Sequence, residues 1–215
     1  MTRRTFLKAS AATAAVSAVT VEALSRATLP MASGQAAPGA ATQGKMITTT
    51  SVKLNVNGKD YVVALQPRDT LNDVLRNSIG LTGTKRPCNR CECGGCTVVI
   101  DGRNVYSCTV LAIRSGGGQK IMTVEGLANG TTPHPLQMAY VKYDAMQCSY
   151  CIPGQLMSAY ALLTTNNTPT RDQIRQGMSG NICRCGTYAH QMQAIEEAAK
   201  VVSGAQPSVV MPPVA

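Results

Sequence analysis

Eight of the nine cysteines in this 215-residue chain fall into two groups with different spacing. The first group reads C-x4-C-x2-C followed by a more distant fourth cysteine, and the second reads C-x2-C followed, about thirty residues later, by C-x-C. The members are Cys88, Cys93, Cys96 and Cys108 in the first group and Cys148, Cys151, Cys183 and Cys185 in the second. Four thiolates are the usual ligands of an iron-sulfur cluster, and the first spacing is that of plant-type 2Fe-2S centres. Two such sites in one short chain predict a protein that conducts electrons.

Disulfides and structural zinc are the alternative uses of so many cysteines. An odd count leaves one thiol unpaired, and Cys183 and Cys185 are too close in sequence for an easy disulfide with each other. Zinc sites of four cysteines generally combine two C-x2-C pairs, which neither group does. Gly94 and Gly95 in the first group also suit a close approach of backbone N–H groups to a cluster. Both alternatives are therefore disfavoured.

The N-terminus resembles an export signal. Arg3-Arg4 is a twin-arginine dipeptide, and a weakly apolar run rich in Ala, Ser and Thr follows over residues 9–21. Such a signal is an address read by a receptor, and this run is too short to span a bilayer. A chance Arg-Arg before an amphipathic helix is the alternative. We expect export to the periplasm after folding around a cofactor, with cleavage within residues 30–42.

The charge of the chain gives little support for nucleic-acid binding. The formal net charge is +9, but the basic residues are scattered, and the only local concentration is Lys85-Arg86 with Arg90. Aromatic residues make up 4% of the chain and are not interleaved with the basic ones. Because iron-sulfur clusters with four thiolates are anionic, the positive excess is better explained as their compensation.

The pattern of the chain predicts an α+β protein with two cluster domains. Apolar alternation around Asn57-Gly58 indicates a hairpin, and Asp69 or Thr70 would cap the following helix. The order of elements around the first cysteine group is that of a β-grasp, plant-type ferredoxin-like domain. The expected elements are a hairpin over residues 51–65, a helix over 71–79, a second hairpin over 97–109 and a strand over 120–124.

The rest of the chain is predicted to be a four-helix bundle that holds the second 2Fe-2S cluster. The expected helices cover residues 135–144, 153–165, 170–178 and 189–202. The cysteine pairs precede the second and fourth of these helices, so the anionic cluster would lie at two helix N-termini. The expected domains are a twin-arginine signal peptide and linker (1–44), the ferredoxin-like domain (45–125), the helical domain (126–204) and a flexible tail (205–215).

Four motifs follow one another in the chain. They are Gly-Thr-Lys-Arg at 83–86, Cys-Gly-Gly-Cys-Thr-Val at 93–98, Gln-Cys-x-Tyr-Cys-x-Pro-Gly-Gln at 147–155 and Gly-Asn-Ile-Cys-Arg-Cys-Gly at 180–186. Together they resemble the iron-sulfur subunit of the xanthine oxidase family of molybdenum hydroxylases, over residues 52–203. Within that family, the leader and the Cys-Arg-Cys-Gly-Thr-Tyr sequence are most similar to the small subunits of periplasmic aldehyde oxidoreductases.

The resemblance implies partners and an order of electron transfer. A large subunit would hold the molybdopterin cofactor and oxidise the substrate, and this chain would carry no catalytic residue. Electrons would pass to the second cluster, then to the first, and then to FAD in another subunit or to a membrane cytochrome c. Gln147 and Cys185 match positions that touch the pterin in the family. Aldehyde oxidation to a carboxylic acid is the expected reaction, with N-heterocycle hydroxylation or a freestanding periplasmic ferredoxin as alternatives.

Two residues depart from the family pattern. Pro87 stands where Gly usually precedes the first ligand, and it removes an N–H that could face a sulfide. Cys91 lies inside the ligand loop, where we interpret it as a bystander, with a substitute ligand or an oxidation-sensitive thiol as alternatives. His134 and His190 lie at expected helix starts and are disfavoured as metal ligands. Tyr150 and Tyr188 flank the second group, where they are expected to shield the cluster from water.

Overall fold

The first hairpin forms at the predicted position. A computed structural model describes residues 48–209, so the predicted leader and the end of the predicted tail lie outside the described residues. Strands β1 (Thr50–Val56) and β2 (Lys59–Leu65) pair in antiparallel fashion, with Val56 opposite Lys59. Asn57 and Gly58 between them adopt φ values of 53° and 77°, the left-handed conformation that a two-residue hairpin turn requires. The Asn-Gly signal is thus confirmed.

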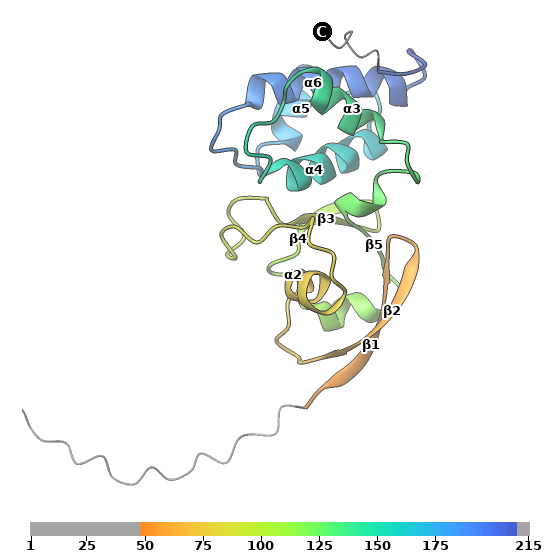
Figure 1. Cartoon of the computed structure of the whole chain (residues 1–215), viewed down its shortest axis with the longest axis vertical. Helices are drawn as coiled ribbons and strands as arrows, with labels where there is room; N and C mark the ends of the chain where they lie inside the picture. The colour runs from red at the N-terminus through yellow and green to blue at the C-terminus, as the bar shows by residue number, and fades with distance from the viewer. Residues whose placement is uncertain (1–47, 210–215) are drawn as a thin grey trace, which may run out of the picture. The chain divides into compact units, whose positions relative to one another are not determined.

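A five-stranded mixed sheet contains this hairpin (Figure 1). The remaining strands are β3 (Thr97–Ile100), β4 (Arg103–Tyr106) and β5 (Lys120–Met122), and the order is β2-β1-β5-β3-β4. Strand β5 pairs parallel to β1 and antiparallel to β3. The second hairpin was predicted to extend to residue 109, but β4 ends at Tyr106. The chain turns there, with the Thr109 amide donating to the Tyr106 carbonyl, and this turn returns Cys108 toward Cys96.

The predicted helix over residues 71–79 begins as expected but widens after one turn. Helix α2 (Leu71–Asp73) is capped by Thr70, whose hydroxyl accepts a hydrogen bond from the Asp73 amide. It continues as the π-helical segment η1 (Val74–Ser78), in which the Ile79 amide donates to the Val74 carbonyl. Leu71, Val74 and Leu75 are buried against the sheet in one hydrophobic core.

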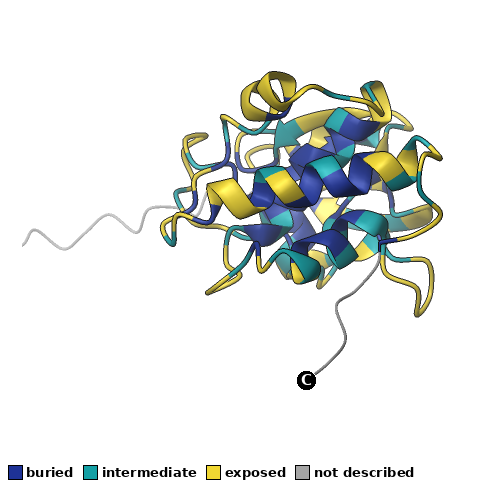
Figure 2. Ribbon diagram, turned by 90° about the horizontal axis from the view of Figure 1, so that it is seen from above, coloured by how far each residue is buried: buried dark blue, intermediate teal, exposed yellow. Residues whose placement is uncertain are grey.

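Four helices follow the sheet, with bounds within two residues of those predicted. They are α3 (Pro135–Lys142), α4 (Ile152–Thr165), α5 (Arg171–Gly177) and α6 (Tyr188–Val202). The buried faces of these helices form a second hydrophobic core, whereas their outer faces are exposed (Figure 2). The short helical turns η2 (Ala112–Gly116) and η3 (Val124–Gly126) flank β5.

The two hydrophobic cores meet at strand β3. All four residues of β3 are buried, with Val98 and Ile100 in the core beneath the sheet and Val99 in the core of the helices. Helix α4 packs against this strand (Figure 1). Because side chains of a strand alternate between its faces, β3 belongs to both cores at once. The described residues 48–209 accordingly lie in one compact unit.

Candidate metal centres

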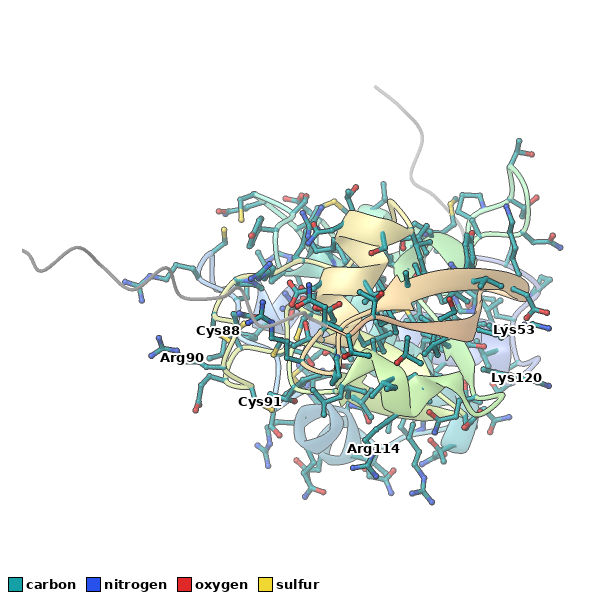
Figure 3. All side chains as sticks on the ribbon, turned by 90° about the horizontal axis from the view of Figure 1, so that it is seen from below. Lys53, Cys88, Arg90, Cys91, Arg114 and Lys120 are labelled. Carbon is teal, nitrogen blue, oxygen red and sulfur yellow. The ribbon has the colours of Figure 1, made fainter. Side chains whose placement is uncertain are left out.

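The first cysteine group lies in the loop between η1 and β3 and in the turn after β4. The thiols of Cys88 and Cys93 interact with each other, and so do those of Cys96 and Cys108. Cys96 and Cys108 are buried, whereas Cys88 and Cys93 are partly exposed. Cys88 lies at the edge of the unit near Arg90 and Cys91, away from Lys53 and Lys120 (Figure 3). The predicted ligands of this group are thus brought together as two pairs.

The second group also forms two pairs of thiols. The Sγ atoms of Cys148 and Cys185 lie 3.4 Å apart, and the thiols of Cys151 and Cys183 interact. Cys151 is the N-cap residue of α4, and Thr187, just after Cys185, is the N-cap residue of α6. Two helix N-termini therefore converge on this group, as predicted, and their positive dipole ends favour an anionic group.

The pairwise arrangement distinguishes between the candidate metals. All nine cysteines lie within the described residues, and none of them forms a disulfide bond. Zinc needs four ligands around one centre, whereas a 2Fe-2S cluster divides its four protein ligands between two irons. The donor set therefore fits 2Fe-2S clusters better than zinc.

In three of these pairs, the pKa of one thiol is lowered and that of its neighbour is raised. Burial disfavours the Cys183 thiolate, but the Thr187 hydroxyl, backbone amides and Cys151 overcome it and lower the Cys183 pKa to about 7. Burial, with Cys183 nearby, raises the pKa of Cys151 to about 12. Burial likewise opposes the Cys88 thiolate, but backbone amides of the loop lower its pKa to about 7. Each such pair is suited to share a proton until a metal replaces it.

Direct hydrogen bonds join the two cysteine loops. The Ile182 amide donates to the carbonyl of Cys93 at 3.0 Å, and Asn181 Nδ2 donates to the carbonyl of Gly94 at 3.0 Å. The Tyr106 hydroxyl at the end of β4 donates to the Gly180 carbonyl at 2.8 Å. Cys93, a predicted ligand in the first group, is thus hydrogen-bonded to the residue that precedes Cys183, a predicted ligand in the second.

The other predicted residues have varied positions. Gln147 and Cys148 are exposed and Cys185 is partly exposed, so one side of the second group faces solvent. Tyr150 and Tyr188 were expected to shield the cluster, but in this chain each is about half exposed. Tyr188 has a structural contact as well, because its hydroxyl accepts the Cys183 amide hydrogen at 2.7 Å.

Neither histidine lies at a thiol group. His134 caps α3, with Nδ1 accepting from the Leu136 amide, and His190 Nδ1 contacts the Tyr143 carbonyl at 2.8 Å. Thr187, whose Oγ1 lies 3.4 Å from Cys183 Sγ, was not predicted from the sequence. The sequence signals for Thr187 are its place at the start of a helix and its membership of the Cys-Arg-Cys-Gly-Thr-Tyr sequence, and neither indicates a contact with a thiol.

Comparisons with known proteins agree with this donor set. A family model described as a [2Fe-2S] binding domain matches residues 123–196, which include the whole second cysteine group. A model of the twin-arginine translocation pathway signal sequence matches residues 1–20. Within residues 48–209, no helix has the length and apolar character needed to cross a membrane.

Curated relatives and solved structures extend the likeness to most of the chain. The aldehyde oxidoreductase iron-sulfur-binding subunit PaoA of Escherichia coli (strain K12) is 39% identical, over 93% of this chain and 88% of that protein. One subunit of the nicotinate dehydrogenase of Pseudomonas putida is 42% identical, over 70% of this chain and 96% of that protein. A chain of quinoline 2-oxidoreductase from Pseudomonas putida 86 superimposes with a TM-score of 0.70 at 39% identity, over 73% of this chain and 97% of that chain.

Fold and donor set thus define an iron-sulfur protein of the electron-transfer class. The length and identity of the matches are more specific: the chain belongs to the iron-sulfur subunits of the xanthine oxidase family of molybdenum hydroxylases. Its twin-arginine signal directs it to the periplasm. The family resemblance and the export signal inferred from the sequence are both confirmed.

Proposed function

We propose that this chain relays electrons through two 2Fe-2S clusters from a molybdopterin site in a large partner subunit. The first cluster would be held by Cys88, Cys93, Cys96 and Cys108, and the second by Cys148, Cys151, Cys183 and Cys185. The first site would belong to a β-grasp, ferredoxin-like domain (45–125) and the second to a four-helix bundle (126–204). Residues 1–44 would be the signal peptide and linker, and 205–215 a flexible tail.

The hydrogen bond between the Ile182 amide and the Cys93 carbonyl is the observation that carries this proposal. Cys93 is a proposed ligand of the first cluster. Ile182 immediately precedes Cys183, a proposed ligand of the second cluster, in the chain. Backbone and one hydrogen bond therefore form a continuous connection between the sites. A 2Fe-2S cluster supplies one-electron chemistry when bound, and the chain's own residues hold the two sites in fixed contact.

The exposed side of the second site is suited to contact a partner subunit. Gln147 and Cys148 are exposed there, and the apolar side chains of Ile182, Tyr150 and Tyr188 are 54%, 51% and 45% exposed. A large molybdenum-binding subunit that covers this side would remove them from water. Gln147 and Cys185 would then contact the pterin. The first site would deliver electrons to an FAD-binding subunit or a membrane cytochrome c.

Aldehydes are the proposed substrate class of the assembled enzyme. The relative from the aldehyde oxidoreductase of Escherichia coli matches 93% of this chain, whereas the relative from nicotinate dehydrogenase matches 70%. The larger share favours oxidation of an aldehyde to a carboxylic acid. N-heterocycle hydroxylation is the second candidate, because relatives and structural neighbours carry such names.

Low-temperature EPR of the dithionite-reduced protein, purified from its own host and analysed for metals, tests the proposal. We expect two distinct 2Fe-2S signals, about four irons per chain, and a molybdenum-containing companion subunit. Two clusters in a protein that purifies alone would instead indicate a freestanding ferredoxin. Zinc without an EPR signal would contradict both interpretations.

A further inference from the structure

Thr187 has its hydroxyl group among three polar partners at the start of α6. Oγ1 lies 3.4 Å from Cys183 Sγ, 3.3 Å from the Ala145 carbonyl and 2.7 Å from Gln191 Nε2. Thr187 is 7% exposed and Gln191 is 3% exposed. Because both side chains are buried, this hydroxyl forms its hydrogen bonds with these three groups rather than with bulk water.

The direction of each bond follows from what each atom can donate. Gln191 Nε2 can only donate, so the Thr187 oxygen accepts that bond. The single hydroxyl hydrogen of Thr187 then has two acceptors in reach, Cys183 Sγ and the Ala145 carbonyl. A cysteine that binds a metal is a thiolate without hydrogen, and a charged acceptor forms a stronger hydrogen bond than a neutral carbonyl. In the loaded protein the hydrogen therefore points to Cys183.

We propose that Thr187, oriented by Gln191, donates a hydrogen bond to the Cys183 thiolate and raises the reduction potential of the second cluster. The inference rests on the proposed function, in which Cys183 is a ligand of that cluster. Reduction adds negative charge to the cluster and its sulfurs, so a donor at a ligand sulfur stabilises the reduced form more than the oxidised form. Thr187 would act through the Cys183 sulfur and would not contact the substrate.

Thr187→Val is the main test, because it keeps the branched shape and removes only the hydroxyl. In the complete complex, an EPR-monitored redox titration should show the reduction equilibrium constant of the second cluster falling about tenfold, which is about 59 mV for one electron. Thr187→Ser, which keeps the hydroxyl, should return the constant to within about twofold of wild type. The first cluster serves as an internal reference in every sample, and its potential should stay constant.

Gln191→Met tests the orienting role. It preserves length and burial but removes the amide that donates to Thr187 Oγ1, so the hydroxyl is less firmly held and points to Ala145 for part of the time. We expect a decrease in the second cluster's equilibrium constant that is smaller than for Thr187→Val, and no further decrease when both changes are combined. Thr164→Val is the matched control, because that exposed hydroxyl bonds to the Tyr160 carbonyl of its own helix; it should change neither potential.

Exchangeable hydrogens near the reduced second cluster supply an independent measurement. After exchange into D2O, ENDOR should detect a coupled deuteron that disappears in Thr187→Val and persists in Thr187→Ser. An unchanged second-cluster potential in a Thr187→Val protein that keeps both EPR signals would overturn the inference. If Thr187→Val does not retain its cluster, an unchanged potential in Gln191→Met overturns it. The complete absence of 2Fe-2S signals from wild type would refute the proposed function instead.

Discussion

Cys91 is the one cysteine outside the two groups, and its surroundings indicate whether it can serve as a ligand. Cys91 lies three residues after Cys88 and adopts a left-handed conformation, with φ of 63°. Its thiol is exposed and within 3.6 Å of the Thr109 hydroxyl, while the Cys88 thiol interacts with that of Cys93. The geometry thus favours Cys88 as the ligand and Cys91 as a bystander.

Replacing these two cysteines separately tests that assignment. Cys91→Ala should leave both reduced 2Fe-2S EPR signals and the iron content unchanged, because the change removes no ligand. Cys88→Ala should abolish the signal of the first cluster alone, because one of its irons loses a thiolate. The opposite pattern would make Cys91 the ligand.

Tyr140 carries a polar atom in the core of the helices. Its side chain is fully buried, and among the described residues its hydroxyl has no hydrogen-bond partner. Burial, together with the nearby Cys151 and Cys183 thiols, raises its pKa, so the hydroxyl stays protonated. An unpaired buried hydroxyl is destabilising in the cluster-free chain.

Tyr140→Phe should therefore increase the free energy of unfolding of the cluster-free protein by about 1–2 kcal/mol. Urea denaturation followed by circular dichroism would measure this change. Tyr150→Phe is the matched control, because Tyr150 is about half exposed and its hydroxyl is accessible to water. A destabilised Tyr140→Phe protein would show that the hydroxyl has a partner, such as a buried water.

Between elements, an ion pair connects the first and last helices of the helical region. Lys142 Nζ in α3 lies 2.6 Å from Glu197 Oε1 in α6, and Gln206 Nε2 donates to the same oxygen. These bonds, chiefly that from Lys142, hold the pKa of Glu197 at about 2. Because Glu197 is only 6% exposed, this contact is less screened than the surface ion pairs.

The depressed pKa predicts a specific acid dependence. A carboxyl group whose pKa is lowered by folding stabilises the fold above its unfolded pKa, near 4.5, and loses that effect as pH falls toward 2. Glu197→Gln should lower the free energy of unfolding by about 2 kcal/mol at pH 7 and flatten its decline between these pH values. The control Glu196→Gln, at a more exposed ion pair, should change stability by less than about 1 kcal/mol. Parallel pH profiles for wild type and Glu197→Gln would refute the role of this contact.

At the scale of the whole molecule, the contact of α4 with the first cysteine loop leaves no room for a side chain at residue 154. A Cβ atom at Gly154 would collide with the carbonyl oxygen of Gly94. Because that oxygen belongs to the backbone, no side-chain rotation could relieve the collision. The sheet and the helices can approach this closely only because residue 154 has no side chain. The bonds between the cysteine loops depend on that approach.

Gly154→Ala should accordingly destabilise the chain by about 1–3 kcal/mol and lower the content of both clusters. Thermal unfolding and iron analysis of the purified complex would detect these effects. Gly177→Ala is the matched control, because its Cβ would meet only the flexible side chain of Leu162. Equal behaviour of the two variants would show that the Gly154 contact is not a constraint on the assembly.

Local sequence patterns determined most of the secondary structure of this protein. The cysteine spacings, the twin-arginine dipeptide, the Asn57-Gly58 turn and the helix caps at Thr70 and Thr170 act over a few residues, so their meaning is readable without a fold. The hairpins and the four helices were predictable for that reason. The widening of the α2–η1 helix was not, because its helical spacing looks like that of an ordinary α-helix.

Only the tertiary structure decided which groups meet. Asn181 and Gly94 are separated by 87 positions, and Cys148 and Cys185 by 37. Contacts at such separations depend on how α4 packs on β3 and on where each loop begins and ends, which no local pattern specifies. The pairing of thiols, the bonds between the two loops and the Thr187–Gln191 hydrogen bond at the second site therefore follow from packing, while the chemistry available to them was already set by the residues.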